Sequence, residues 1–220
     1  MARPARGREA LRGPARQAVE VTALRALADQ ELPVPELLDE RADSVLITLL
    51  PGERLDAGTA DLRLRRLLAS GPWLRRLHRR RPPTGLPAAP DDAGIVDRYR
   101  RTGGPPLPLA VPPPTPAVFC HGDWTDGNLL AVSDEITAVL DWEAAHLGDP
   151  VRELARAAYG ASLKDERSVD ALVEGYGADA RAVRAWFPVH AAELWLWFAE
   201  AGPPAYLTQL TERLEGWSDG

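Results

Sequence analysis

The most informative segment of the chain, Phe119–Glu143, reads FCHGDWTDGNLLAVSDEITAVLDWE. Two apolar runs are separated by the short acidic turn Ser133–Glu135, a pattern typical of a β-hairpin. Because a tight hairpin brings its two ends together, we expect Asn128 and Asp141 to lie side by side. An amide oxygen beside a carboxylate is a suitable site for Mg²⁺. Asp123, one loop earlier, is then placed to accept a proton from a substrate hydroxyl.

The same segment resembles the catalytic segment of the aminoglycoside phosphotransferase and choline kinase-like family. The resemblance rests on His121-Gly122-Asp123, on Asn128, and on Asp141-Trp142-Glu143, in this order and spacing. That family has a protein-kinase-like fold and transfers the γ-phosphate of ATP or GTP to hydroxyl groups of small molecules. The resemblance implies that Asp123 is the catalytic base and that Asn128 and Asp141 bind Mg²⁺.

Two further residues are implied to support the catalytic loop. In the family the loop histidine, here His121, packs against the loop and hydrogen-bonds it in place. Gly148-Asp149-Pro150, followed by a predicted helix, also looks like the family, in which this aspartate braces the loop through hydrogen bonds. The alternative for Asp123 is structural, because an aspartate before a turn often only caps the backbone.

The nucleotide side of the site is expected in the N-terminal part of the chain. A helix is predicted over residues 15–29, and strands over residues 34–38 and 44–50, with an acidic turn over 39–43. The resemblance makes Glu20 the candidate partner of a phosphate-binding lysine. It places a hinge that contacts the nucleotide base at Thr48, Leu49 and Leu50.

The family's phosphate-binding elements have no clear counterpart upstream of this helix. Lys164 is the only lysine in the chain, and no glycine-rich pair of strands precedes residue 15. Arg12, beside a short strand predicted over residues 9–12, is the one candidate for the lysine's place, although a guanidinium is not equivalent to an ammonium group. Three explanations stay open: a start placed too late or a truncated chain, a natural short form that closes its nucleotide site differently, or a degenerate kinase that binds without turnover.

The predicted fold is therefore α+β, a protein-kinase-like two-lobe fold. Residues 1–50 form a reduced N-terminal lobe, and residues 51–220 form a mostly helical C-terminal catalytic lobe. Within the second lobe, Ser70-Gly71-Pro72 predicts a break between two helices, because proline suits the first position of a helix. Five helices are predicted after Asp149, over residues 151–160, 168–176, 178–186, 188–201 and 205–217.

The composition limits the possible locations and binding partners of the protein. The chain has no run of about 18 apolar residues that would span a membrane, and its start does not look like a secretory signal. A single cysteine, Cys120, fits the reducing cytoplasm. Basic residues cluster over 75–81 without interleaved aromatic residues, which argues against nucleic-acid binding. The sequence carries no signal of the oligomeric state.

The net charge of −6 is unevenly distributed. Residues 1–116 hold 19 arginines against 14 acidic residues, and the remaining residues carry a net charge of −11. An acidic C-terminal half could attract a cationic acceptor, or could simply keep the protein soluble. Glu193 and Glu200 lie on one face of a predicted aromatic-rich helix, where they could hold substrate amines or be surface charges. One or two aromatic residues of this region could line the acceptor pocket; the candidates are Trp186, Trp195, Trp197 and Phe198.

Overall fold

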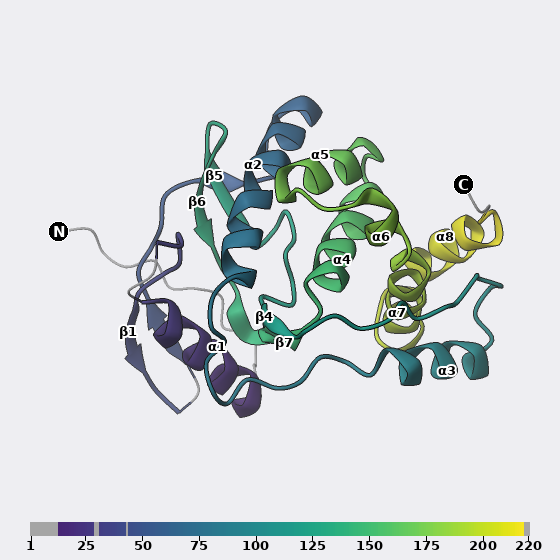
Figure 1. Cartoon of the computed structure of the whole chain (residues 1–220), viewed down its shortest axis with the longest axis horizontal. Helices are drawn as coiled ribbons and strands as arrows, with labels where there is room; N and C mark the ends of the chain where they lie inside the picture. The colour runs from purple at the N-terminus through teal and green to yellow at the C-terminus, as the bar shows by residue number, and fades with distance from the viewer. Residues whose placement is uncertain (1–12, 29–30, 43, 218–220) are drawn as a thin grey trace.

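The computed structural model describes residues 13–28, 31–42 and 44–217. Figure 1 shows α1 and β1 at one end of the molecule, β4 and β7 near its middle, and α3, α7 and α8 at the other end. The elements are α1 (Pro14–Leu27), β1 (Leu37–Glu40), β2 (Val45–Ile47), β3 (Glu53–Arg54), α2 (Ala60–His78), α3 (Asp92–Thr102), β4 (Val118–Cys120), β5 (Leu129–Val132), β6 (Glu135–Val139), η1 (Trp142–Ala144), β7 (His146–Gly148), α4 (Pro150–Ser162), α5 (Arg167–Tyr176), α6 (Ala180–Arg184), α7 (Phe187–Glu200) and α8 (Pro204–Glu215). Arg12 and the strand predicted over residues 9–12 lie outside the described residues.

The N-terminal elements are a helix and a small hairpin. Pro14 starts α1, where its missing N–H costs nothing, and the helix packs on η1. β1 and β2 pair antiparallel, but β1 begins later than predicted and includes Asp39 and Glu40, which were expected in the turn. Pro33 and Pro35 explain the shift, because neither has an N–H to donate to a neighbouring strand. The division into lobes at residue 50 stays a prediction.

Helix α2 runs without interruption through Ser70-Gly71-Pro72, so the predicted helix break there is wrong. The reason is tertiary. A side chain on Gly71 would collide with the backbone of Gly175 in α5, and one on Gly175 would collide with the carbonyl group of Leu68. The two helices therefore approach at paired glycines, and this packing outweighs the local signal of the proline.

The predicted hairpin forms as β5 and β6, and the structure adds the short strands β3 and β7, which were not predicted. β4 pairs antiparallel with β7, and the hairpin β5–β6 carries β3 on its outer edge, in the order β3-β5-β6. In the hairpin, Leu129 pairs with Val139 and Val132 with Glu135, which leaves a tight turn at Ser133 with a positive φ of 54°. These two pairs of strands hold both ends of the segment between Cys120 and Leu129.

The C-terminal part is helical, and the five helices predicted after Asp149 are present as α4–α8. The Asp149 side chain caps α4 by accepting hydrogen bonds from the backbone N–H groups of Val151 and Arg152. The core runs from α1 to α8, with Trp142, Phe119 and Tyr99 among its largest fully buried side chains. Among the described helices, none is both long and apolar enough to cross a bilayer.

Candidate active site

The segment between β4 and β5 carries the predicted catalytic loop. Its far end is fixed because the carbonyl of Asn128 accepts a hydrogen bond from the backbone N–H of Leu140 at 2.8 Å. This bond continues the hairpin ladder by one pair and places Asn128 next to the residue before Asp141. Asp141 then adopts a left-handed backbone conformation, with φ of 63°, where the chain turns from β6 into η1.

Asp123 is held by Asn128. The Nδ2 atom of Asn128 donates to the Asp123 carboxylate oxygen Oδ2 at 2.8 Å and to the Asp123 backbone carbonyl at 3.0 Å. The other carboxylate oxygen, Oδ1, lies 4.0 Å from the guanidinium of Arg156, and the Asp123 side chain is 40% exposed. The carboxylate is therefore fixed on one side and accessible on the other.

His121 is buried inside the loop. Its Nε2–H donates to the carbonyl of Leu140 at 2.9 Å, and its Nδ1 accepts from the backbone N–H of Asp123 at 3.1 Å. The ring packs edge-on against Trp142, with centroids 4.5 Å apart. Burial lowers the pKa of His121, so the imidazole is neutral at pH 7. Nε2 ties the loop to the residue after β6 and Nδ1 bonds within the loop, so neither nitrogen is available to a substrate.

Glu153 in α4 braces the loop, and the sequence analysis did not assign it. Its Oε1 accepts a hydrogen bond from the backbone N–H of Gly122 at 2.5 Å, and its Oε2 contacts His78 Nε2 at 2.6 Å. Burial works to raise the pKa of Glu153, but hydrogen bonds and the nearby histidines outweigh it and lower the pKa to about 2. Gly122 has φ of 86°, and a side chain there would collide with the carbonyl of Ala144, so the loop passes tightly over η1.

Asp149, expected to brace the loop, does something else. Its carboxylate caps α4 and accepts hydrogen bonds from the backbone N–H and the hydroxyl of Thr115, each at 2.8 Å. It therefore ties the connector before β4 to the start of α4, one step away from the loop. The signal that could have identified Glu153 is its position, an acidic residue in the first turn of the helix that Asp149 caps.

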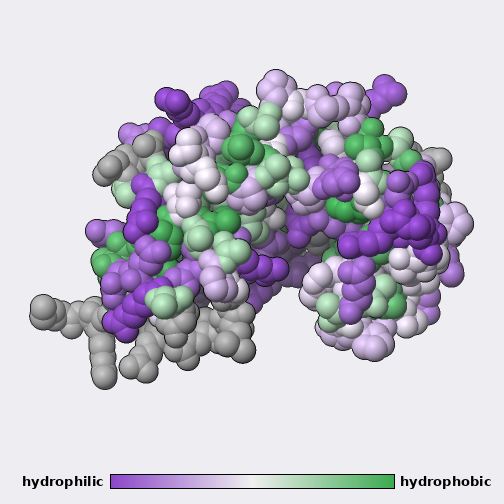
Figure 2. Space-filling view, turned by 90° about the horizontal axis from the view of Figure 1, so that it is seen from below, coloured by the Kyte–Doolittle hydropathy of each residue, from purple (hydrophilic) through white to green (hydrophobic). Residues whose placement is uncertain are grey.

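Asp123 and Asp141 line the same cavity, which has a volume of about 630 Å³. Arg16 and Glu143 line it from the N-terminal side, and Arg156, Glu193 and Trp197 line it from α4 and α7. Figure 2 shows the surface hollowed between the N-terminal end of the molecule and the end formed by the C-terminal helices, with hydrophilic residues at its border. Asn128 does not line the cavity and sits behind Asp123.

The charges on the α7 side of the cavity are organised around Glu193. Burial works to raise the pKa of Glu193, but hydrogen bonding to His190 and the charges of Arg156 and Arg152 lower it to about 2. Arg156 Nη1 lies 3.0 Å from Glu193 Oε1. Glu200, considered together with Glu193 as an amine-binding residue, instead pairs with Arg98 at 3.4 Å and does not line this cavity.

One aromatic residue of α7 reaches the cavity. Trp197 is 54% exposed and lines it, whereas Trp186 and Trp195 are buried in the core. Trp186 and Trp195 are therefore core residues, and Trp197 is part of the cavity wall.

Of the residues predicted on the nucleotide side, those that the structure describes, Glu20 and Thr48–Leu50, do not line this cavity. Glu20 is buried in α1, the Thr48 hydroxyl accepts from the backbone N–H of Glu36 at 2.9 Å, and Leu49 is 67% exposed beside Leu50. Lys164 pairs with Asp56 at 2.9 Å and with Asp126 at 3.0 Å, so its ammonium group is engaged elsewhere. A nucleotide-binding role for Arg12, Glu20 and Thr48–Leu50 stays a prediction.

The donor set suits a divalent cation. The Asn128 amide nitrogen is the donor to Asp123, which leaves the amide oxygen as the atom that could bind a cation. Asp141 lies just after the end of β6, at the start of η1, and lines the cavity. Amide and carboxylate oxygens are the ligands that Mg²⁺ prefers.

Comparison with known proteins agrees with the fold and with the resemblance. Residues 105–187 match the phosphotransferase enzyme family. No curated protein sequence matches the chain. The macrolide 2'-phosphotransferase MphH from Brachybacterium faecium has a similar structure (21% identity, TM-score 0.61, covering 95% of this chain and 84% of that chain). A choline/ethanolamine kinase family protein from Mesorhizobium loti also has a similar structure (19% identity, TM-score 0.66, covering 90% of this chain and 77% of that chain). The GDP and kanamycin complex of APH(2")-IIia is a third similar structure (15% identity, TM-score 0.65, covering 91% of this chain and 82% of that chain). The predicted α+β, kinase-like fold is confirmed.

Proposed function

Because the phosphotransferase enzyme family matches residues 105–187 and the fold is kinase-like, we propose that this chain is a phosphotransferase for small molecules. It transfers the γ-phosphate of ATP or GTP, with Mg²⁺, to a hydroxyl group of its acceptor. Among the similar structures, one is a complex of APH(2")-IIa with streptomycin and ATP, and another is a complex of APH(2")-IIia with GDP and kanamycin. These complexes support a purine nucleotide and a small polar acceptor.

A single observation carries the proposal. Asp123 and Asp141 open into one cavity, and Asn128 links them, through its side chain to Asp123 and through its backbone to the residue before Asp141. Phosphoryl transfer needs little covalent help from the protein; it needs alignment of the reacting groups and neutralisation of charge. A fixed carboxylate beside a pair of oxygen ligands meets both needs.

Each residue then has a distinct role. Asp123 accepts the proton of the acceptor hydroxyl and orients it. Asn128 and Asp141 hold Mg²⁺, which neutralises charge on the phosphate groups when it is bound. His121 and Glu153 keep the loop in place. The carboxylates of Asp123, Asp141, Glu143 and Glu193 outnumber the guanidinium groups of Arg16 and Arg156 in the cavity, which favours an acceptor that carries positive charge.

The experiment is a nucleotide-consumption assay with Mg²⁺ and either ATP or GTP. Acceptors would be drawn from aminoglycosides, macrolides, choline, sugars and homoserine. We expect turnover that requires both the metal and one acceptor class and that is lost in Asp141→Asn. The matched control is Asp134→Asn, because Asp134 is an exposed residue of the same hairpin and pairs with Arg65 on the surface. Acceptor-dependent turnover that survives in Asp141→Asn would refute the proposal.

A second candidate function is nucleotide or ligand binding without turnover. The observation that favours it is the position of Lys164, the sole lysine of the chain, which is occupied by Asp56 and Asp126 and does not line the cavity. Calorimetric titration with ATP and GTP separates the two functions. Nucleotide binding together with no turnover of any acceptor would favour the second.

A further inference from the structure

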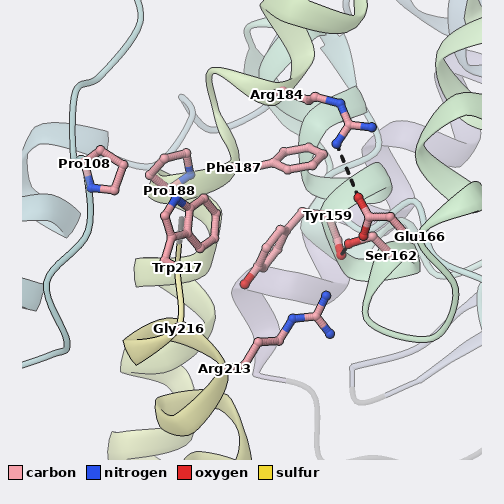
Figure 3. A pocket seen from close by; sticks show the side chains of 10 residues that line it. All are labelled: Pro108, Tyr159, Ser162, Glu166, Arg184, Phe187, Pro188, Arg213, Gly216 and Trp217. Atoms are coloured by element: carbon pink, nitrogen blue, oxygen red, sulfur yellow. Dashed lines mark hydrogen bonds and ion pairs between the residues drawn. The ribbon is translucent and has the colours of Figure 1, made fainter. Parts of the chain in front are cut away.

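A second cavity, of about 640 Å³, lies on the other side of Tyr159 from the Asp123 cavity. Figure 3 shows that residues of α4, of the start of α7 and of the end of α8 line it, together with Pro108 from the connector before β4. None of the residues assigned above to phosphoryl transfer lines it, and Tyr159 is the one residue that lines both cavities. The second cavity therefore needs its own explanation.

The Tyr159 side chain carries a polar group that the described part of the chain does not satisfy. The residue is only 4% exposed, and its hydroxyl has no hydrogen-bond partner among the described residues. Buried tyrosine hydroxyls normally have a partner, because an unsatisfied one has lost its bond to water without replacement. Figure 3 shows the hydroxyl end of Tyr159 directed toward the side of the cavity where Trp217 and Arg213 lie. The hydroxyl oxygen itself is covered, so a ligand in the cavity reaches it by displacing a neighbouring side chain such as the exposed Arg213.

The second feature of the cavity is the positive charge of Arg213, which has no counter-ion among the described residues. Arg184, on the opposite wall, is different, because it pairs with Glu166 at 3.3 Å and with Asp170 at 3.7 Å. Burial raises the pKa of Tyr159 to about 12, although the charge of Arg213 works in the opposite direction, so the phenol is a neutral donor at pH 7. A hydroxyl donor and a cation together suit an anion.

One part of the remaining wall is apolar and is formed by Phe187, Pro188, Trp217 and Pro108. The other part is polar and is formed by Ser162 and by Glu166, whose carboxylate is paired with Arg184. Aromatic and proline faces of this kind favour planar apolar groups. The anion expected beside Tyr159 and Arg213 should therefore be attached to a ring system.

We propose that this cavity is a second small-molecule site, which binds an aromatic carboxylate. The carboxylate accepts a hydrogen bond from the Tyr159 hydroxyl and pairs with the Arg213 guanidinium, and the ring lies against Trp217 and Pro188. The site is separate from phosphoryl transfer, so it can be tested whether or not the chain turns over a nucleotide.

The experiment is isothermal titration of the full chain with indole-3-acetate and with its neutral analogue, indole-3-acetamide. We expect indole-3-acetate to bind the wild type and to bind at least about tenfold more weakly in Tyr159→Phe and in Arg213→Gln, the range for a lost charge-assisted hydrogen bond. Arg181→Gln is the matched control, because Arg181 is an exposed arginine of α6 that does not line the cavity. Its affinity for indole-3-acetate should equal that of the wild type.

The amide probe and the melting temperature sharpen the test. Indole-3-acetamide should bind weakly and equally in wild type and Arg213→Gln, because it carries no charge to lose. Without ligand, Tyr159→Phe should melt at the same temperature as the wild type or higher, because it removes an unsatisfied hydroxyl. The proposal is overturned if indole-3-acetate does not bind, if its binding is unchanged in both variants, or if unliganded Tyr159→Phe melts lower.

Discussion

Asn128 donates two hydrogen bonds to Asp123, one to the side-chain carboxylate at 2.8 Å and one to the backbone carbonyl at 3.0 Å. A residue expected only to bind metal therefore also orients the proposed base. In the proposed mechanism one amide group serves both roles, which would couple binding of a cation at the amide oxygen to the direction of the Asp123 carboxylate.

This coupling predicts the effect of Asn128→Asp. A second carboxylate would stand within hydrogen-bonding distance of Asp123, and like charges that close raise the pKa of one member of the pair. We expect the acidic limb of the pH–rate profile to move to higher pH by about one unit or more, with a lower maximal rate. The measurement is kcat against pH for the acceptor identified in the panel. An acidic limb that stays in place would show that the two side chains are not coupled in solution.

Removing the proposed base tests Asp123 directly. Asp123→Asn keeps the size of the side chain but cannot accept the hydroxyl proton, so kcat should fall by about 10²–10⁴-fold. Because the side chain is 40% exposed, the melting temperature should change little. Steady-state kinetics and a thermal melt on the same preparation separate the two effects. An unchanged kcat would leave Asp123 as a turn-capping residue, the structural alternative.

Glu153 should matter for stability as well as for the loop. Glu153→Gln keeps one acceptor for the Gly122 N–H but removes the charge that faces His78, so we expect a loss of about 1–3 kcal/mol in the free energy of unfolding. Urea denaturation measures it. Glu174→Gln is the control, because Glu174 is an exposed glutamate of α5, the neighbouring helix. Equal unfolding free energies in the two variants would contradict the bracing role.

Stability should decrease in acid in two stages. Burial lowers the pKa values of His121 and His190, so each binds its proton more weakly in the folded state than in the unfolded state, where the pKa is 6.5. Their contribution is therefore present above pH 6.5 and is lost as the pH falls below it. The pKa of Glu153 is lowered from 4.5 to about 2, so protonation of this carboxylate causes a second loss of stability as the pH falls between these two values. Urea unfolding at a series of pH values from neutral into this range measures how the free energy of unfolding changes with pH. A free energy of unfolding that stays constant just below pH 6.5 would contradict the first stage.

The sequence was sufficient to predict those parts of the structure that depend on residues close together in the chain. The turn at Ser133–Glu135 and the apolar runs on either side of it predicted the β5–β6 hairpin, which places Asn128 opposite Leu140, the residue before Asp141. It was not sufficient for Glu153, because the acceptor of the Gly122 N–H lies 31 residues away and is reached only when α4 packs beside the loop. Asp149 was the better local candidate, but its carboxylate accepts its hydrogen bonds from the start of α4 and from Thr115.

The uninterrupted helix α2 shows the same limit and gives the last prediction. Gly71 looked like part of a helix break, but its role depends on Gly175, which the sequence places in another helix more than 100 residues later. Gly71→Ala should therefore destabilise the protein by about 1–3 kcal/mol through overpacking, despite the higher helix propensity of alanine. Gly160→Ala is the matched control, because a side chain at this helical glycine would meet nothing within 4 Å. It should be neutral or stabilising by about 0.5–1 kcal/mol. Urea denaturation of both variants decides the matter: if Gly71→Ala is as stable as Gly160→Ala, then α2 and α5 do not approach as closely as the structure has them.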